Sequence, residues 1–342
     1  MTFTHGRYAV RGGEYPAAHR CVNIGWMAPS PDVWSRPSDV HRIRGKKGVR
    51  LVSLIIAQLF NGLQTGSIFA LVALGYSMVY GIIMLLNFAH GDIIMIGAYT
   101  TFYAMTTFHL HPVFSVILAV CVSTVLGVVI EKVAYTPLRS APRLSLLITA
   151  IGVSFLLENG AQLLFGADTK SMDVIVPGNM SFLGTTVSYA AILTIVVTLI
   201  AMAALTFLVQ KTRLGKAMRA VSEDMGAAQL MGISLNKTIS FTFAVGSALA
   251  GIGSVLYLCA YPQASPTMGS MLGLKAFVAA VLGGIGSIPG AMIGGFAIGL
   301  LEAVVTAVGL SVWKDGVVFA VLIVVLLCKP TGILGHKTTE KV

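Results

Sequence analysis

Long apolar runs alternate with short polar segments along most of the chain. Several of these runs approach or exceed the about 20 apolar residues that cross a bilayer core as a helix. They lack the alternating segments of about ten residues that are typical of a membrane β-barrel. The pattern predicts an all-α integral membrane protein, with apolar segments at roughly residues 51–80, 93–108, 113–131, 144–165, 187–209, 238–260, 271–285, 290–309 and 314–328.

Some of these runs are interrupted by glycine or proline. The uncharged run 51–89 is too long for one upright helix and contains Asn61-Gly62, whereas 271–285 is short and leads into GGIGSIPGAMIGG. Transporters place transport sites in such broken segments, because non-helical backbone at membrane depth must line a cavity or pack on protein. We therefore expect Gly-broken or re-entrant segments, with helix-break glycines at Gly283, Gly284, Gly286 and Gly290.

Further glycines recur at a spacing of four residues. GxxxG pairs allow the backbones of two helices to approach closely in lipid. We expect tight helix packing at Gly62/Gly66, Gly290/Gly294 and Gly295/Gly299.

Basic residues are concentrated in some polar segments and scarce in another. The loops 131–143 and 210–238 and the C-terminal segment are rich in Lys and Arg, whereas the loop 166–186 is not. Because Lys and Arg mark cytoplasmic loops, both chain ends and the two basic loops are expected in the cytoplasm. An even number of spans must then precede residue 131, so one of the three segments there is re-entrant or the first run splits. We predict a bundle of about eight transmembrane helices, within a range of about eight to ten.

Three regions follow from these boundaries. Residues 1–50 are polar, carry +6 of the net charge of +10, and lack the apolar stretch of a signal peptide. They are expected to be a disordered cytoplasmic tail or the product of a start codon assigned too early. Residues 51–330 form the transmembrane domain, which contains the cytoplasmic loop 210–238, and residues 331–342 form a short cytoplasmic tail.

The residue patterns of an enzyme are missing. The sequence has no GxxxxGK[ST] phosphate-binding loop, no HExxH zinc motif and no paired carboxylates in a polar loop. His109 and His111 are two residues apart at a helix end, so their side chains point apart. Basic residues are not interleaved with aromatic ones, as they are in nucleic-acid-binding surfaces. We expect no enzymatic activity, metal, cofactor or nucleic-acid site in this chain, and ATP and Mg on a partner subunit.

Ionisable residues inside apolar segments are functional candidates, because a charge buried in lipid costs a few kcal/mol or more. The sequence NFAHGD (87–92) places three polar side chains at a helix break, where they can cap free backbone groups of a re-entrant turn or contact substrate. Lys275 lies early in a broken segment. A structural hydrogen bond to a neighbouring helix is the alternative role for each carboxylate. The candidates for a translocation path or a structural turn are Asn87, His90, Asp92, Glu158 and Glu302.

The segment 210–238 departs from the apolar pattern. Arg219 and Glu223 are spaced for an ion pair on a helix, while Gly226 weakens that helix midway and Gly232 marks a turn. Such an amphipathic unit either lies on the membrane surface or enters a groove of a partner. Over 214–228 one helical stripe is apolar, formed by Leu214, Ala217, Met218, Val221, Met225 and Ala228.

Four stretches are distinctive in content and order. They are NGLQTGSIFALVALGYSMVYGIIMLLNFAHGDIIMIGAY (61–99), LLITAIGVSFLLENGAQLLFG (146–166), RAVSEDMGAAQLMGI (219–233) and AVLGGIGSIPGAMIGGFAIGLLEAV (280–304). In this order they closely resemble the bacterial branched-chain amino acid permeases of the LivH type, over about residues 51–335. The first fifty residues have no counterpart in that family.

The resemblance implies one of two different permease subunits of an ATP-driven ABC importer in the bacterial inner membrane. Two ATPase subunits would bind below, and a periplasmic or lipid-anchored binding protein would deliver leucine, isoleucine or valine. Glu158 stands where family members often carry an uncharged amide. The resemblance also implies an ATPase-coupling loop that includes Arg213, Gly215, Arg219, Ala220, Glu223, Ala227 and Gly232.

Other functions compete with this interpretation. Permeases for urea and short amides look alike across the same motifs, and in such systems the separate binding protein largely selects the ligand. A stand-alone channel or secondary transporter works without an ATPase, but it typically places several ionisable residues at the membrane midplane. A membrane scaffold does not need Gly-broken segments.

Overall fold

The computed structural model describes residues 37–84, 87–139, 141–182, 185–329 and 331–335. Most of the two predicted tails, residues 1–36 and 336–342, lies outside the described residues. The chain divides into the units Met1–Gly48 and Val49–Val342. Helix α1 begins at Pro37, inside the region predicted as a tail. Everything that follows concerns the second unit, which includes α1 from Val49 onward.

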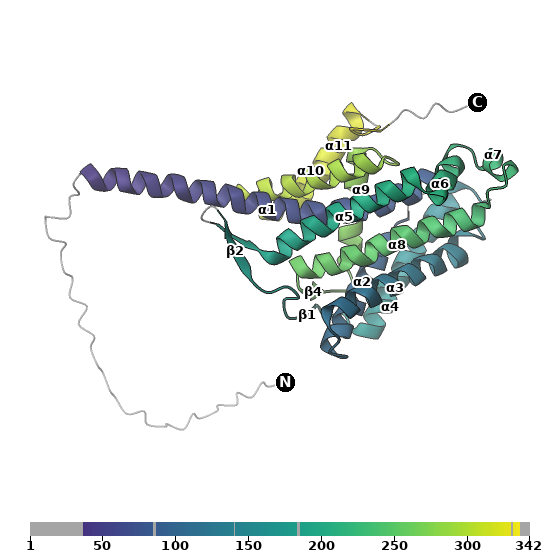
Figure 1. Cartoon of the computed structure of the whole chain (residues 1–342), viewed down its shortest axis with the longest axis horizontal. Helices are drawn as coiled ribbons and strands as arrows, with labels where there is room; N and C mark the ends of the chain where they lie inside the picture. Colours follow the sequence, from purple (N-terminus) through teal and green to yellow (C-terminus); the bar gives the residue numbers. More distant parts are fainter. Residues whose placement is uncertain (1–36, 85–86, 140, 183–184, 330, 336–342) are drawn as a thin grey trace, which may run out of the picture. The chain divides into compact units, whose positions relative to one another are not determined.

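The second unit is built almost entirely from helices (Figure 1). The first half of the chain contains α1 (Pro37–Ile83), α2 (His90–Thr106), α3 (Pro112–Ile130), which continues into the π-helical turn η2 (Glu131–Tyr135), α4 (Arg143–Phe165) and α5 (Tyr189–Lys211). The second half contains α6 (Arg213–Glu223), α7 (Met225–Leu230), α8 (Leu235–Ala260), α9 (Met268–Gly283), α10 (Ile288–Ala307), the short 3₁₀ turn η3 (Ser311–Trp313) and α11 (Lys314–Cys328).

The helices match a membrane-spanning bundle. Within the part of the chain that the structure describes, seven helices are long and apolar enough to cross a membrane. The helices α2 and α9, of 17 and 16 residues, are shorter and largely buried. This confirms the predicted all-α membrane protein, and the number of helices agrees with a bundle of about eight.

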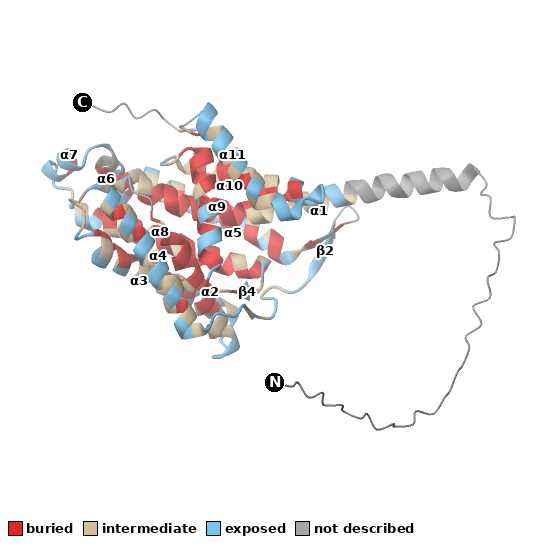
Figure 2. Cartoon of the chain, turned by 180° about the vertical axis from the view of Figure 1, so that it is seen from behind, coloured by how far each residue is buried: buried red, intermediate tan, exposed pale blue. Residues whose placement is uncertain are grey.

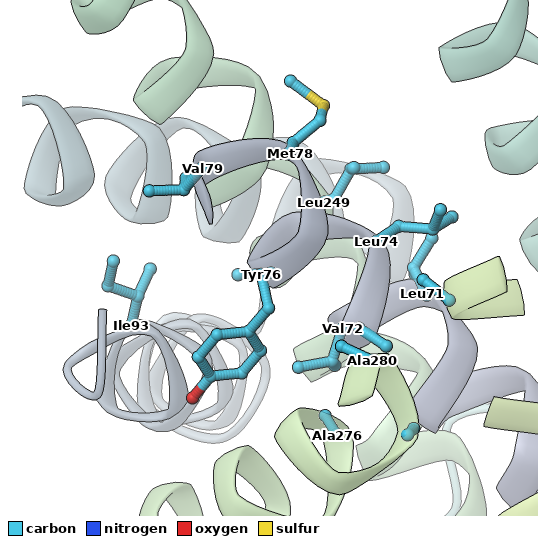
Figure 3. Packing of buried hydrophobic residues seen from close by; sticks show 14 of the residues in the cluster. Leu71, Val72, Leu74, Tyr76, Met78, Val79, Ile93, Leu249, Ala276 and Ala280 are labelled. Atoms are coloured by element: carbon cyan, nitrogen blue, oxygen red, sulfur yellow. The ribbon is translucent and has the colours of Figure 1, made fainter. Parts of the chain in front are cut away.

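Helix α1 lies at the centre of the bundle. In its most apolar stretch 83% of the residues are buried, against 6% in α11 and 17% in α4. Figure 3 shows Leu71, Val72 and Leu74 of α1 beside residues of α8 and α9. Buried residues are concentrated inside the bundle (Figure 2). The helices α3, α4, α5 and α11 present exposed apolar side chains, as lipid-facing or subunit-facing helices do.

Of the two alternatives for the segments before residue 131, a split of the first apolar run is not found. Helix α1 continues unbroken past Asn61-Gly62 to Ile83. Its glycines serve packing, because a Cβ at Gly62 would lie 2.8 Å from the Cβ of Ala303, and one at Gly299 would clash with the backbone of Gly66. The GxxxG pairs of α1 and α10 therefore face each other, which confirms the expected packing role.

The predicted break near residue 284 is confirmed. Helix α9 ends at Gly283, and Gly284 and Gly286 have φ angles of 108° and 87°, a left-handed region that favours glycine. Gly283 and Gly290 pack backbone to backbone as α10 begins. The C-terminal segment then covers the end of α9, because the Ile333 and Leu334 amides donate to the carbonyl oxygens of Leu282 and Gly283 (both 2.9 Å).

Short strands close the other end of the bundle. The strands β1 (Lys170–Ser171) and β4 (Gln263–Ala264) pair antiparallel, with Lys170 opposite Ala264. The strands β2 (Asn179–Phe182) and β3 (Thr185–Ser188) form an antiparallel hairpin that leads into α5. Figure 1 shows β2 at one end of α5 and α6 at the other.

Candidate functional site

The segment that the sequence singles out forms two short helices beyond the end of α5. Thr212 caps α6, because its hydroxyl accepts a hydrogen bond from the Gly215 amide (3.0 Å). A Cβ at Gly215 would collide with the carbonyl oxygens of Leu208 and Val209. Glycine at this position lets α6 turn back directly against the end of α5.

The apolar stripe of α6 packs on the bundle. Met218 and Val221 are 3% and 1% exposed and belong to the main core, as does Ala228 of α7. Leu214 and Met225, which the stripe also includes, are exposed. The centre of the apolar face of α6 is therefore covered by the bundle, while its two ends are exposed.

Two details of the predicted helix are wrong. The helix does not run through 214–228 but breaks at Asp224, whose backbone is extended and whose side chain caps α7 by accepting from the Ala227 amide (2.9 Å). The break thus comes from an N-cap rather than from Gly226. Arg219 does not pair with Glu223; its guanidinium donates to the Gln210 carbonyl oxygen (3.4 Å).

The end of α7 is the most protruding apolar point of this segment. Leu230 and Met231 are 90% and 83% exposed. Gly232 follows with a φ angle of 83°, and its amide donates to the Gln229 carbonyl oxygen (3.0 Å). This confirms the predicted turn at Gly232. Arg213, Glu223 and Ala227 are also exposed, so most of the predicted coupling residues are accessible.

A small hollow of about 80 Å³ connects α6 with the centre of the bundle. Met218 and Arg219 line it from α6, Ser77 and Ile82 from the end of α1, and Gly286 from the α9–α10 turn. The Ser77 hydroxyl accepts a hydrogen bond from the Gly286 amide (3.0 Å). The residues of α6, of the central helix and of the glycine turn thus line one hollow.

The polar side chains of NFAHGD are buried, but they do not cap the helix as predicted. The N-cap of α2 is Ala89, without a side-chain hydrogen bond, and the His90 amide donates to the Asn87 carbonyl oxygen (3.1 Å). The side chains bind other helices instead. Asn87 accepts from the Tyr135 hydroxyl (2.9 Å), and Asp92 accepts from the Ser154 hydroxyl of α4 (2.5 Å). Backbone groups close the turn, so the polar side chains are free for these contacts.

Glu158 and His90 also have side-chain partners on other helices. Glu158 of α4 accepts from the Ser270 hydroxyl of α9 (2.5 Å), one helical turn from Ser154. The His90 ring meets the Tyr76 ring edge to face, with centroids 4.8 Å apart. The structure thus brings Asn87, His90, Asp92 and Glu158 into one region around α2 and α4 and leaves Glu302 elsewhere.

Glu302 belongs to a second charged cluster. Lys275 Nζ of α9 lies 2.7 Å from Glu302 Oε1 of α10 and 2.6 Å from Asp315 Oδ1 of α11. It also lies 5.8 Å from the centroid of the Phe69 ring of α1. The sequence predicts Lys275 and Glu302 as separate candidates and misses Asp315. The available signal was a carboxylate in the first turn of the last apolar run.

Comparison with known proteins adds the family. The family model described as "Branched-chain amino acid transport system / permease component" matches residues 58–326. The chain is 45% identical over 300 residues to the high-affinity branched-chain amino acid transport system permease protein BraD of Pseudomonas aeruginosa, covering 84% of this chain and 98% of that protein. The chain belongs to this family.

Two further matches concern the family and the fold. The permease protein LivH of Escherichia coli K12 is 43% identical over 301 residues, 84% of this chain and 97% of LivH. A solved metal-chelate type ABC transporter in an inward-facing conformation shares the fold, with a TM-score of 0.50 at 14% identity. That match covers 85% of this permease and 99% of the solved chain. The expected resemblance to LivH-type permeases is confirmed, and the structure is that of a transporter subunit.

Proposed function

We propose that this chain is a transmembrane permease subunit of an ATP-driven importer for leucine, isoleucine and valine. Family membership over residues 58–326 supports the substrate class. The observation that carries the mechanism is the α6–α7 segment. Its buried face is fixed to the bundle, while the tip at Leu230 and Met231 projects two apolar side chains outward. An exposed apolar point of this kind suits insertion into the groove of a partner.

In this proposal the partners are a second, different permease, two ATPase subunits that bind ATP and Mg, and a solute-binding protein. The α6–α7 end and both chain termini face the cytoplasm of a bacterial inner membrane, in agreement with the Lys/Arg bias of the loops. ATP-driven closure of the ATPase pair moves α6. The residues that line the hollow beside Ser77 and Gly286 then pass this movement to α1 and to the α9–α10 turn. The two end states must differ in contact energy at α6–α7, or nucleotide could not shift their populations.

A variant of the tip tests the coupling role. We expect Leu230→Asp/Met231→Asp to reduce co-purifying ATPase by more than about tenfold, because burying each apolar side chain contributes about 1.5–3 kcal/mol. The permease is expressed with its operon partners, extracted in mild detergent and quantified by mass spectrometry. Met180→Asp is the matched control, since Met180 is also exposed but lies on β2 at the other end of α5.

A second variant separates binding from transmission. Arg219→Glu places the opposite charge at the hollow without altering the tip. It is expected to keep the ATPase and to lose uptake of radiolabelled leucine in proteoliposomes. Normal leucine uptake in both variants contradicts the coupling role. Uptake of urea or short amides in place of leucine by the wild-type complex overturns the proposed substrate class, and uptake without ATP indicates a carrier.

A further inference from the structure

Two adjoining hollows lie around the Lys275 cluster. They measure about 350 and 360 Å³ and share Thr65, Tyr261, Glu302 and Lys314 in their walls, so they form one groove. Ligand sites in proteins are typically about 300–1,000 Å³. Thr65 precedes Ile82, which lines the hollow beside α6, by 17 positions along α1, or about 25 Å at 1.5 Å per residue. The groove therefore lies far from the coupling segment.

The charges in the groove are balanced. Lys275 lies between the carboxylates of Glu302 and Asp315, and Lys314 lines both hollows. Lys275 and Glu302 have side chains only 10% and 9% exposed, whereas Asp315 is 36% exposed. Two positive and two negative groups thus form one cluster, in which Lys275, Lys314 and Glu302 line the groove and Asp315 contacts Lys275.

The remaining wall separates polar from apolar surface. Asn61, Gln64 and Thr65 of α1 line the polar part. Phe69 of α1 and Met271 and Leu272 of α9 line the part around Lys275. Each surface matches one part of a small molecule with a charged head and an aliphatic side chain.

We propose that this groove holds the amino acid on the permease during transport, an inference that rests on the proposed function. The α-carboxylate binds the Lys275 and Lys314 ammonium groups, the α-ammonium binds the Glu302 carboxylate, and the aliphatic side chain packs on Phe69, Met271 and Leu272, while Asp315 holds Lys275 in place. A zwitterion can enter this cluster and leave no charge uncompensated. A cation or an anion would leave one buried charge without a partner, which is costly at low dielectric.

A purely structural role of the cluster predicts different behaviour. A buried ion pair can be replaced by neutral side chains of similar volume with little loss of stability, whereas removal of one partner is strongly destabilising. If the cluster only joined α9, α10 and α11, neutralising all three groups together would restore function. If the cluster binds the substrate head group, the neutral variant folds but does not transport.

The test compares single and combined variants in the complete transporter. Lys275→Met and the triple variant Lys275→Met/Glu302→Gln/Asp315→Asn are reconstituted with their partners, and Lys132→Met, at an exposed position outside the groove, is the matched control. We expect the triple variant to co-purify the ATPase at wild-type amounts, yet to lose leucine uptake by more than about tenfold. Removal of hydrogen bonds to charged groups, at about 1.5–3 kcal/mol each, accounts for this loss.

A binding measurement without the solute-binding protein examines the site directly. Radiolabelled leucine is equilibrated with the nucleotide-free complex in nanodiscs and displaced with unlabelled analogues. Unlabelled leucine should displace the radiolabelled leucine at least about tenfold better than two analogues do. These are 4-methylpentanoate, which lacks the ammonium, and 3-methylbutylamine, which lacks the carboxylate. The triple variant should bind no leucine, and Lys132→Met should bind as the wild type does.

Three results overturn the inference and leave the proposed function standing. They are a triple variant with wild-type kcat and KM for leucine uptake, equal displacement by the analogue that lacks one charge, and a wild-type complex that imports leucine but binds none at millimolar concentrations. Failure of the wild-type complex to import leucine overturns the proposed function itself.

Discussion

Glu131 is the most completely buried carboxylate outside the two polar regions described above. It is 0% exposed and lies in η2, where its oxygens accept hydrogen bonds from Arg139, from Thr136 (2.8 Å) and from Ser240 of α8 (2.6 Å). Arg139 reaches further to Asn236 at the start of α8. Glu131 and its partner Arg139 therefore hold the end of α3 against α8, close to the α7–α8 turn.

Removal of Arg139 tests this contact. Arg139→Gln leaves Glu131 buried without its cation, and a loss of roughly 3 kcal/mol of stability is expected, at the low end for buried pairs because Arg139 is 23% exposed. The apparent melting temperature of the detergent-solubilised protein, followed by size-exclusion chromatography, reports the change. The double variant Glu131→Gln/Arg139→Gln should melt above the single variant. A single variant as stable as the wild type contradicts the prediction.

At the scale of elements, the break between α6 and α7 sets the direction of the projecting tip. Asp224 is the residue that makes the break, because its extended backbone ends α6 while its side chain caps α7. The six residues of α7 are too few to be stable as a helix alone, so the cap and the packing of Ala228 hold it.

Loss of this cap should weaken the tip. We expect Asp224→Ala to destabilise α7 by about 1 kcal/mol, to increase amide hydrogen exchange over residues 225–231 and to reduce leucine uptake severalfold. Asp224→Ser retains a capping oxygen and should behave nearly as the wild type does. Unchanged exchange in Asp224→Ala would show that tertiary packing alone fixes α7.

The helices themselves could be predicted closely from the apolar runs. The expected segments 113–131 and 187–209 correspond to Pro112–Ile130 and Tyr189–Lys211, because desolvation in lipid requires continuous apolar helix. Asp224 also carried a usable signal as an N-cap residue. The pairing of Lys275 with Asp315 could not be predicted from the sequence, because it depends on how α9, α10 and α11 pack. Asn61-Gly62 has the composition of a turn. Gly62 serves helix packing only because it meets α10, which is far away in the sequence.

At the scale of the whole molecule, the contact between α1 and α10 joins two helices that lie near opposite ends of the sequence of the membrane domain. Gly299 has no room for a Cβ because the backbone of Gly66 is in the way, whereas a Cβ at Gly152 on α4 would meet nothing within 4 Å.

This difference predicts opposite outcomes for one chemical change. Gly299→Ala should separate α1 from α10 and sharply reduce the amount of folded protein in the membrane. Gly152→Ala should leave it unchanged or slightly raise it, since alanine favours helix over glycine by about 1 kcal/mol. Fluorescence-detected size-exclusion chromatography of tagged variants measures both. Equal yields would mean that α1 and α10 can separate without loss of the fold.

The same contact constrains the order of biosynthesis. Gly66 leaves the ribosome roughly 230 residues before Gly299, which at about 5–20 residues per second is on the order of ten to fifty seconds. During that interval the central helix of the finished bundle lacks the glycine surface of α10, and it carries Asn61, Gln64 and Thr65, which later line the groove beside α10. Nascent chains arrested before α10 should therefore be held by the insertion machinery or an intramembrane chaperone, and site-specific crosslinks from residue 61 should pass from that machinery to α10 once translation is complete.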